Sequence, residues 1–229
     1  MKLFYSPIHA FAHKVLITAH EAGVWDQIEP VAVYPFREGF DITVLNPLNK
    51  VPTLTLSDGA VLYGSQAIVE YIDSLAPSGR ALYPEIGPQR WDALRRLALA
   101  DLVFDTATQL TMDGDYSDKP RVKFIEWHWP KVERCLAALN QDAKADRAFD
   151  IGDAATLHAL TYIDLIVPNH VPAPIPRDYN WRTGNESLEA WFDKTIKRPS
   201  VQFHFQKDYG GDISAKNCAA KVQEVLALR

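Results

Sequence analysis

The chain has 229 residues, of which 47% are hydrophobic and 23% charged, and its formal net charge is −5. This composition is typical of a globular protein with enough apolar surface for a sizeable core, in one or two domains. The negative net charge argues against nucleic acid as a partner. No apolar run reaches the roughly 18 residues that a membrane span needs, so a membrane partner is not expected either.

The first residues and the cysteines indicate the cellular compartment and whether a metal is bound. Lys2–Tyr5 read as a strand and lack the longer apolar stretch of a secretory signal. The two cysteines, Cys135 and Cys218, lie far apart and fit neither a disulfide framework nor a metal site. We therefore expect a cytoplasmic protein with no bound metal.

Short strands and helices alternate in the first third of the chain. Strand patterns at 2–5 and 28–33 flank a helical pattern at 10–22, which Gly23 ends. A short, irregular helix is expected at 41–45, and Asn46-Pro47 would stop it.

Residues 50–72 are the most informative segment. Two apolar runs flank Asp58-Gly59, which is a strong signal for a β-hairpin. Ser65 then precedes an apolar-periodic stretch and is predicted to cap a helix. The resulting order, β-α-β-α-β-β-α, predicts one parallel crossover and one antiparallel hairpin. A strand starting at Pro52 and a helix starting at Ser65 leave free backbone groups in one place, where a short peptide can be held by its main chain and carboxylate.

The rest of the chain reads as helical. Prolines and a glycine predict a linker at 77–88, between a first domain at 1–76 and a second at 89–229. The predicted helices of the second domain cover 91–110, 120–139, 156–167, 187–197 and 216–228. Pro130 should kink the second of these. Thr156 is predicted to cap the nearly all-apolar third, which should be the buried central helix.

Several short motifs follow one another along the chain. They are Phe4-Tyr5-Ser6-Pro7, the segment 46–54, Asp58-Gly59, Ser65-Gln66-Ala67-Ile68, Gly152-Asp153-Ala154-Ala155-Thr156 and Arg198-Pro199-Ser200-Val201. In order and spacing they resemble the cytosolic glutathione transferase family. The resemblance implies an α/β plus all-α protein, with a thioredoxin-like βαβαββα N-terminal domain followed by a helical-bundle C-terminal domain. It also implies a homodimer that uses glutathione as co-substrate, with no further cofactor.

The resemblance further implies a set of glutathione-binding residues. The Val51-Pro52 bond is expected to be cis, which turns the Val51 N–H and C=O outward to pair with the cysteinyl unit of glutathione. Ser65, at a helix N-terminus, would take the γ-glutamyl carboxylate. Lys50 would meet the glycyl carboxylate.

Gly64 departs from the family pattern. Relatives usually place Glu or Gln just before the serine, so one charge-assisted hydrogen bond to glutathione is missing here. Gln66, or an acid from a neighbouring subunit, is expected to compensate. Asp101 and Asp105 are the candidates for that acid.

The thiol chemistry is expected where the first strand meets the first helix, because thiolate is the nucleophile and a hydroxyl donor or helix N-terminus lowers the pKa of a thiol. Three residues qualify as catalytic. Ser6 and Tyr5 can donate a hydroxyl hydrogen. His9 occupies the position where many relatives have Ser or Cys, if His13 aligns with their basic residue.

Two functions remain in competition. The first is a glutathione transferase that conjugates the thiolate to an electrophilic, largely apolar small molecule. The alternative is a non-catalytic binding or regulatory protein with the same fold, which Gly64 and the absence of Ser or Cys at position 9 favour. Reduction through a cysteine is disfavoured, because neither cysteine lies in the first domain.

Overall fold

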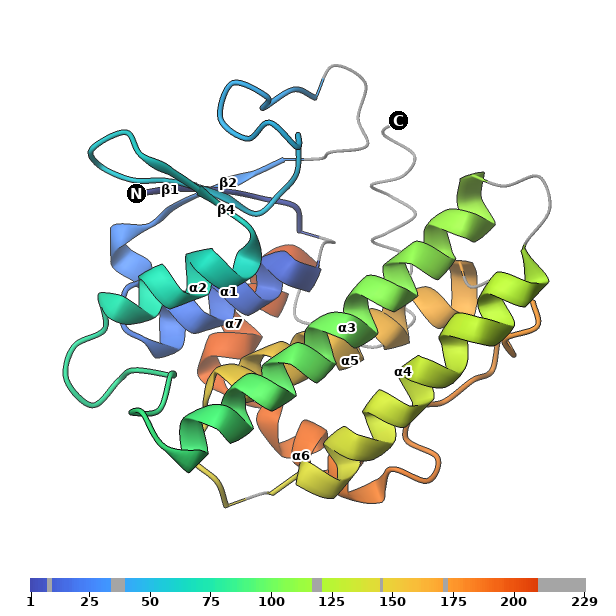
Figure 1. The fold of residues 1–229 in the computed structure, drawn as a ribbon. Coiled ribbons are helices and arrows are strands. Elements are labelled where there is room, and N and C mark those ends of the chain that lie inside the picture. The colour runs from blue at the N-terminus through green and yellow to red at the C-terminus, as the bar shows by residue number, and fades with distance from the viewer. Residues whose placement is uncertain (8–9, 34–39, 117–120, 145, 171–172, 210–229) are drawn as a thin grey trace.

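The computed structural model describes residues 1–7, 10–33, 40–116, 121–144, 146–170 and 173–209 (Figure 1). A four-stranded sheet with helices comes first and a helical region follows, which is the predicted fold class. The strands are β1 (Lys2–Tyr5), β2 (Glu29–Ala32), β3 (Thr53–Thr55) and β4 (Val61–Tyr63). The helices are α1 (Ala10–Glu21), the 3-10 turn η1 (Trp25–Gln27), α2 (Ser65–Ser74), α3 (Pro88–Tyr116), α4 (Val122–Asp142), α5 (Ile151–His170), α6 (Glu186–Thr195) and α7 (Pro199–Tyr209).

The sheet has the strand order β2-β1-β3-β4. β1 and β2 are parallel, as predicted for strands joined through α1, and β3 and β4 form the predicted antiparallel hairpin. In the hairpin turn the Asp58 carboxylate accepts the Ala60 N–H at 2.9 Å, and Gly59 takes a φ of 88°. That left-handed conformation costs little only for glycine, which is why Asp-Gly marks the turn.

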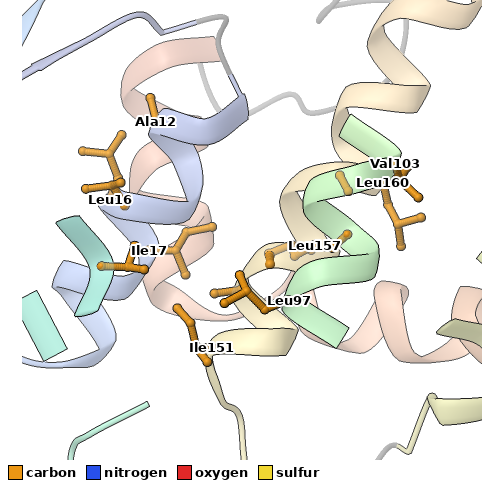
Figure 2. Close-up of a cluster of buried hydrophobic side chains, with 14 of the residues drawn as sticks. Ala12, Leu16, Ile17, Leu97, Val103, Ile151, Leu157 and Leu160 are labelled. Atoms are coloured by element: carbon orange, nitrogen blue, oxygen red, sulfur yellow. The ribbon is translucent and has the colours of Figure 1, made fainter. Parts of the chain in front are cut away.

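A shared core joins the sheet region to the helical region. The core cluster includes Leu16 of α1, Leu97 of α3 and Leu157 of α5, all nearly inaccessible to solvent (Figure 2). α1 packs on α2 on one side and on α5 on the other. The apolar periodicity of α1 thus fixes the first strand-helix junction against α3 and α5.

Residues 41–45 form turns, so the helix expected there is wrong. The Asp41 carboxylate accepts the N–H and the O–H of Thr43, at 2.8 and 2.7 Å, and Asn49 Oδ1 accepts the Ile42 N–H at 2.9 Å. Short polar side chains that satisfy nearby backbone groups compete with helix formation.

The start of α5 also differs from the prediction. Thr156 lies inside the helix, where its hydroxyl donates to the Gly152 C=O at 2.7 Å, so it does not cap α5. The Asp150 carboxylate instead accepts the Gly152 N–H at 2.8 Å, and the Asp153 carboxylate accepts the Asp150 N–H at 3.0 Å. These reciprocal bonds form a capping box made of two acids.

The remaining helices agree with the prediction to within several residues at most ends. Pro130 lies inside α4 as expected. α7 was not predicted, although Pro199 suits its first turn, where no N–H is needed. The helix predicted at 216–228 lies outside the described residues. No helix in the described part of the chain combines the length and the apolar character that crossing a bilayer requires.

Candidate functional site

A pocket of about 300 Å³ opens where β3 and α2 begin, facing α1 and α3. Its lining residues are Phe11, Asn46, Leu48, Lys50, Val51, Pro52, Gly64, Ser65, Gln66 and Asp101. All six residues predicted to bind a ligand, Lys50, Val51, Pro52, Gly64, Ser65 and Gln66, therefore share one pocket. Their individual roles stay predictions.

The Val51-Pro52 bond is cis, as expected. The turn before it is held by buried polar side chains. Asn46 Nδ2 donates to the Lys50 C=O at 2.8 Å and to Thr53 Oγ1 at 3.1 Å, and Thr53 Oγ1 donates to the same carbonyl at 2.8 Å. Within the described residues, the Val51 N–H and C=O take part in no hydrogen bond. The pocket lining therefore includes one free backbone donor and one free backbone acceptor, both of Val51.

α2 begins at Ser65, and Gly64 is its N-cap, so the prediction that Ser65 caps the helix is wrong. Gly64 has a φ of 85°, a conformation that residues with a Cβ rarely adopt. The first backbone bond of the helix runs from the Ile68 N–H to the Gly64 C=O at 3.1 Å. The N–H groups of the first turn, and the Ser65 hydroxyl, are thus not used in side-chain capping. Free N–H groups at a helix N-terminus are able to bind an anion.

Asp101 of α3 brings a negative charge into the pocket. Its carboxylate accepts both hydrogen bonds of the Lys14 ammonium, at 2.7 and 2.8 Å, and lies 3.8 Å from His158 Nε2. Burial opposes ionisation, but His158 and Lys14 outweigh it and lower the pKa of Asp101. Burial lowers the pKa of His158 to about 4, so its ring is neutral at pH 7. Asp101 is therefore a carboxylate, and Lys14 is its main counter-charge.

Comparison with known proteins identifies the family. Residues 10–75 match the family model described as glutathione S-transferase, N-terminal domain. The chain is 26% identical over 211 residues to glutathione S-transferase GstA of Escherichia coli O157:H7, covering 88% of this chain and 96% of GstA. Residues 10–75 therefore form a domain of the glutathione S-transferase family, and the chain is similar to glutathione transferases over most of its length.

Solved structures of other family members agree. A glutathione transferase family member from Pseudomonas fluorescens Pf-5, with bound glutathione, has a TM-score of 0.77 at 29% identity, covering 87% of this chain and 96% of that one. A glutathione S-transferase from Methylobacillus flagellatus KT, also with glutathione bound, has a TM-score of 0.78 at 29% identity, covering 89% of this chain and 98% of that one.

In this chain, the missing side chain at Gly64 leaves open space. A Cβ at this position would have no atom of the described residues within 4 Å. Asp101 of the same chain lines the pocket and brings a negative charge to it. Asp105, the other acid considered, is exposed and accepts a hydrogen bond from Gln109 at 2.8 Å.

Of the three catalytic candidates, Tyr5 and Ser6 do not line the described pocket. Tyr5 and Ser6 are buried, with 1% and 0% of their surfaces exposed, and His9 lies outside the described residues. Within the part of the chain that the structure describes, the Ser6 hydroxyl has no hydrogen-bond partner. Phe11 is the α1 residue that lines the pocket, and its ring packs edge-on against Phe104, with 4.2 Å between centroids. Asn46 holds the turn and was missed as a site residue, although it begins the motif 46–54.

Proposed function

We propose that this glutathione transferase family member binds glutathione in the pocket and conjugates its thiolate to an electrophilic, largely apolar small molecule. The observation that carries the proposal is that unpaired main-chain groups at Val51 and the free start of α2 at Ser65 line one pocket. Glutathione is a small peptide with two carboxylates, so it needs both kinds of group. Glutathione in the structures of the Pseudomonas and Methylobacillus relatives supports this ligand.

Each end of the tripeptide then has a partner. The Val51 N–H and C=O pair with the cysteinyl unit beside Pro52, as in the addition of a strand. The start of α2, with Ser65 and Gln66, takes the γ-glutamyl carboxylate. Lys50 takes the glycyl carboxylate. Asp101 takes the γ-glutamyl ammonium, in place of the acid or amide that Gly64 lacks.

The chemical step requires a thiolate. A free thiol has a pKa of about 8.5, so a donor that lowers it raises the nucleophile's population. The thiolate sulfur attacks the electrophilic carbon, and the leaving group departs with its electron pair. Ser6, Tyr5 and His9 remain our candidates for the donor, with the start of α1 assisting. Because Ser6→Ala removes an unpartnered hydroxyl, a loss of turnover in that variant would report on chemistry rather than folding.

Replacing Ser65 with alanine should weaken glutathione binding by about 10- to 100-fold, because a hydrogen bond to a carboxylate is lost. Calorimetric titration of glutathione measures the change. Ser74→Ala is the matched control, since it lies on the same helix and its hydroxyl bonds to the Tyr71 C=O. Equal affinities in the two variants would contradict the assignment of Ser65. No binding by the wild type at millimolar glutathione would contradict the proposal as a whole.

The burial of Tyr5 and Ser6 favours a second candidate, a protein that binds glutathione without transferring it. Turnover of a chloronitroaromatic substrate with glutathione separates the two. Binding with measurable turnover supports a transferase, and binding without turnover supports a binding or regulatory protein.

We further propose a glutathione-binding domain at 1–76, a linker at 77–88 and a helical domain at 89–229, in a cytoplasmic homodimer. Exposed apolar side chains on β4 and α3, at Tyr63, Trp91 and Leu102, support self-association. A monomer mass in sedimentation equilibrium would contradict the dimer.

A further inference from the structure

A second pocket, of about 270 Å³, lies between the loop after α4 and the junction of α6 with α7. We call it the cationic pocket. Its lining residues are Lys144, Arg147, Phe149, Asp153, Trp191, Lys194, Thr195, Lys197 and Arg198. In Figure 1 the loop after α4 and helix α6 lie at the foot of the view, away from the hairpin and the start of α2. The cationic pocket shares no lining residue with the pocket at Val51 and Ser65, in which we propose that glutathione binds.

The lining of this pocket departs from the composition of the chain. Five of its nine residues are basic and one, Asp153, is acidic. The whole chain has 29 acidic and only 24 basic residues. Average composition therefore does not account for this concentration of positive charge.

Two of the basic residues are neutralised within the fold. Arg147 forms an ion pair with Asp153, and Arg198 forms one with Glu21 at 2.7 Å while its guanidinium lies 4.3 Å from the Phe149 ring centroid. Lys144 and Lys197 differ from them, because within the described residues neither forms an ion pair or a hydrogen bond. Two uncompensated ammonium groups, carried by separate segments, therefore converge on one concavity.

A purely structural reading explains part of this cluster. Lys194 is in the last turn of α6 and Lys197 follows its end, where the helix dipole favours cations by about 0.3–1 kcal/mol each. That reading does not cover Lys144, which follows α4. Nor does it explain why the lysines flank a hollow with apolar surface from Phe149 and Trp191.

We propose that the cationic pocket binds a small aromatic phosphate monoester. Such a group carries about −1.5 to −2 charges at pH 7 and three acceptor oxygens, which matches the two ammonium groups of Lys144 and Lys197. Its ring fits the apolar surface of Phe149 and Trp191. The volume is close to the lower end of the roughly 300–1,000 Å³ of small-molecule sites, so it exceeds the needs of a bare ion.

Calorimetric titration of the full-length protein with phenyl phosphate tests this site. The double variant Lys144→Gln with Lys197→Gln should raise the dissociation constant by at least about tenfold, since two charge-assisted contacts are lost. Both lysines are exposed, so the variant should fold. Lys123→Gln is the control, because Lys123 is an exposed lysine at the start of α4, away from the pocket. Like each of the two substitutions in the double variant, it removes one positive charge.

Three results would overturn the proposal. The first is a dissociation constant that the double variant leaves unchanged, or that Lys123→Gln raises as much. The second is equal affinity for inorganic phosphate and phenyl phosphate, which would point to free phosphate. The third is displacement of phenyl phosphate by glutathione, which would place it in the other pocket. Loss of glutathione binding in Ser65→Ala would leave the first two readouts intact, so this site is tested independently of the proposed function.

Discussion

Replacing Arg96 with methionine should lower the free energy of unfolding by about 3–5 kcal/mol, because it leaves buried charge without its partner. Arg96 is 3% exposed. Its guanidinium donates to Asp150 Oδ2 at 2.6 Å and to Asp153 Oδ1 at 3.0 Å. Both carboxylates cap α5, so the variant weakens the start of the central helix as well as the ion pairs. Urea unfolding followed by circular dichroism measures the loss at pH 7.

The loss of unfolding free energy in Arg96→Met should be smaller in mildly acidic solution than at pH 7. Burial, with the charge of Asp150, already raises the pKa of Asp153 above its ordinary value of 3.8, and removing Arg96 raises it further. At a pH between the pKa of Asp153 in the unfolded state and its higher pKa in the folded state, the folded state binds more protons. The stability of the variant therefore rises as the pH falls through that window.

Arg95→Met is the control for Arg96→Met. Arg95 directly precedes Arg96 on α3, is half exposed, and pairs with Asp142 and Asp92 at the surface. Exposed pairs of this kind contribute about 0–1 kcal/mol. Equal losses of unfolding free energy in the two variants would show that the contribution of the Arg96 ion pairs to stability does not depend on their burial.

The Arg96 cluster also shows where sequence reasoning stops. Periodicity and turn residues act over a few positions, so β1, α1 and the hairpin at Asp58-Gly59 were predicted correctly. Arg96 and Asp153 are 57 positions apart, and nothing local pairs them. Caps were misread for a related reason. A hydroxyl before a helix predicts an N-cap, but Gly64, with its positive φ, takes that role ahead of Ser65.

In the candidate site, too, some residues could be predicted from local sequence and others depend on tertiary packing. Its lining residues around Val51 and Ser65 come from two short segments, which a hairpin brings together, so motif and turn signals were enough to predict that they lie close to one another. Asp101 was considered only as a neighbour's contribution, because its place in the pocket depends on how α3 packs near α1. The thiol donor depends on the first strand-helix junction, where sequence alone did not choose among Ser6, Tyr5 and His9.

Replacing Asp101 with asparagine should cost about 3–5 kcal/mol of unfolding free energy at pH 7, since it leaves the Lys14 ammonium buried without a counter-charge. The Lys14 side chain is fully buried, and its ammonium donates two hydrogen bonds to the Asp101 carboxylate. Burial already lowers the pKa of Lys14, while Asp101 opposes that shift. The substitution should therefore lower the pKa of Lys14 further.

This shift gives Asp101→Asn a distinctive pH dependence. Between the lowered pKa of folded Lys14 and its ordinary value of 10.5, the unfolded state binds more protons than the folded state. The stability of the variant should therefore rise with pH across that window, and its deficit should narrow toward pH 10. Urea unfolding at pH 7, 8.5 and 10 measures this trend, which the loss of an ordinary surface hydrogen bond would not produce.

Asp105→Asn is the matched control, four residues along α3, exposed and bonded only to Gln109 among the described residues. It should change stability by no more than about 0.5 kcal/mol. If Asp101 also holds the γ-glutamyl ammonium, Asp101→Asn should weaken glutathione binding and Asp105→Asn should not. Lost stability with unchanged glutathione affinity would assign Asp101 to the Lys14 pair alone, and the compensation for Gly64 would then have to come from Gln66.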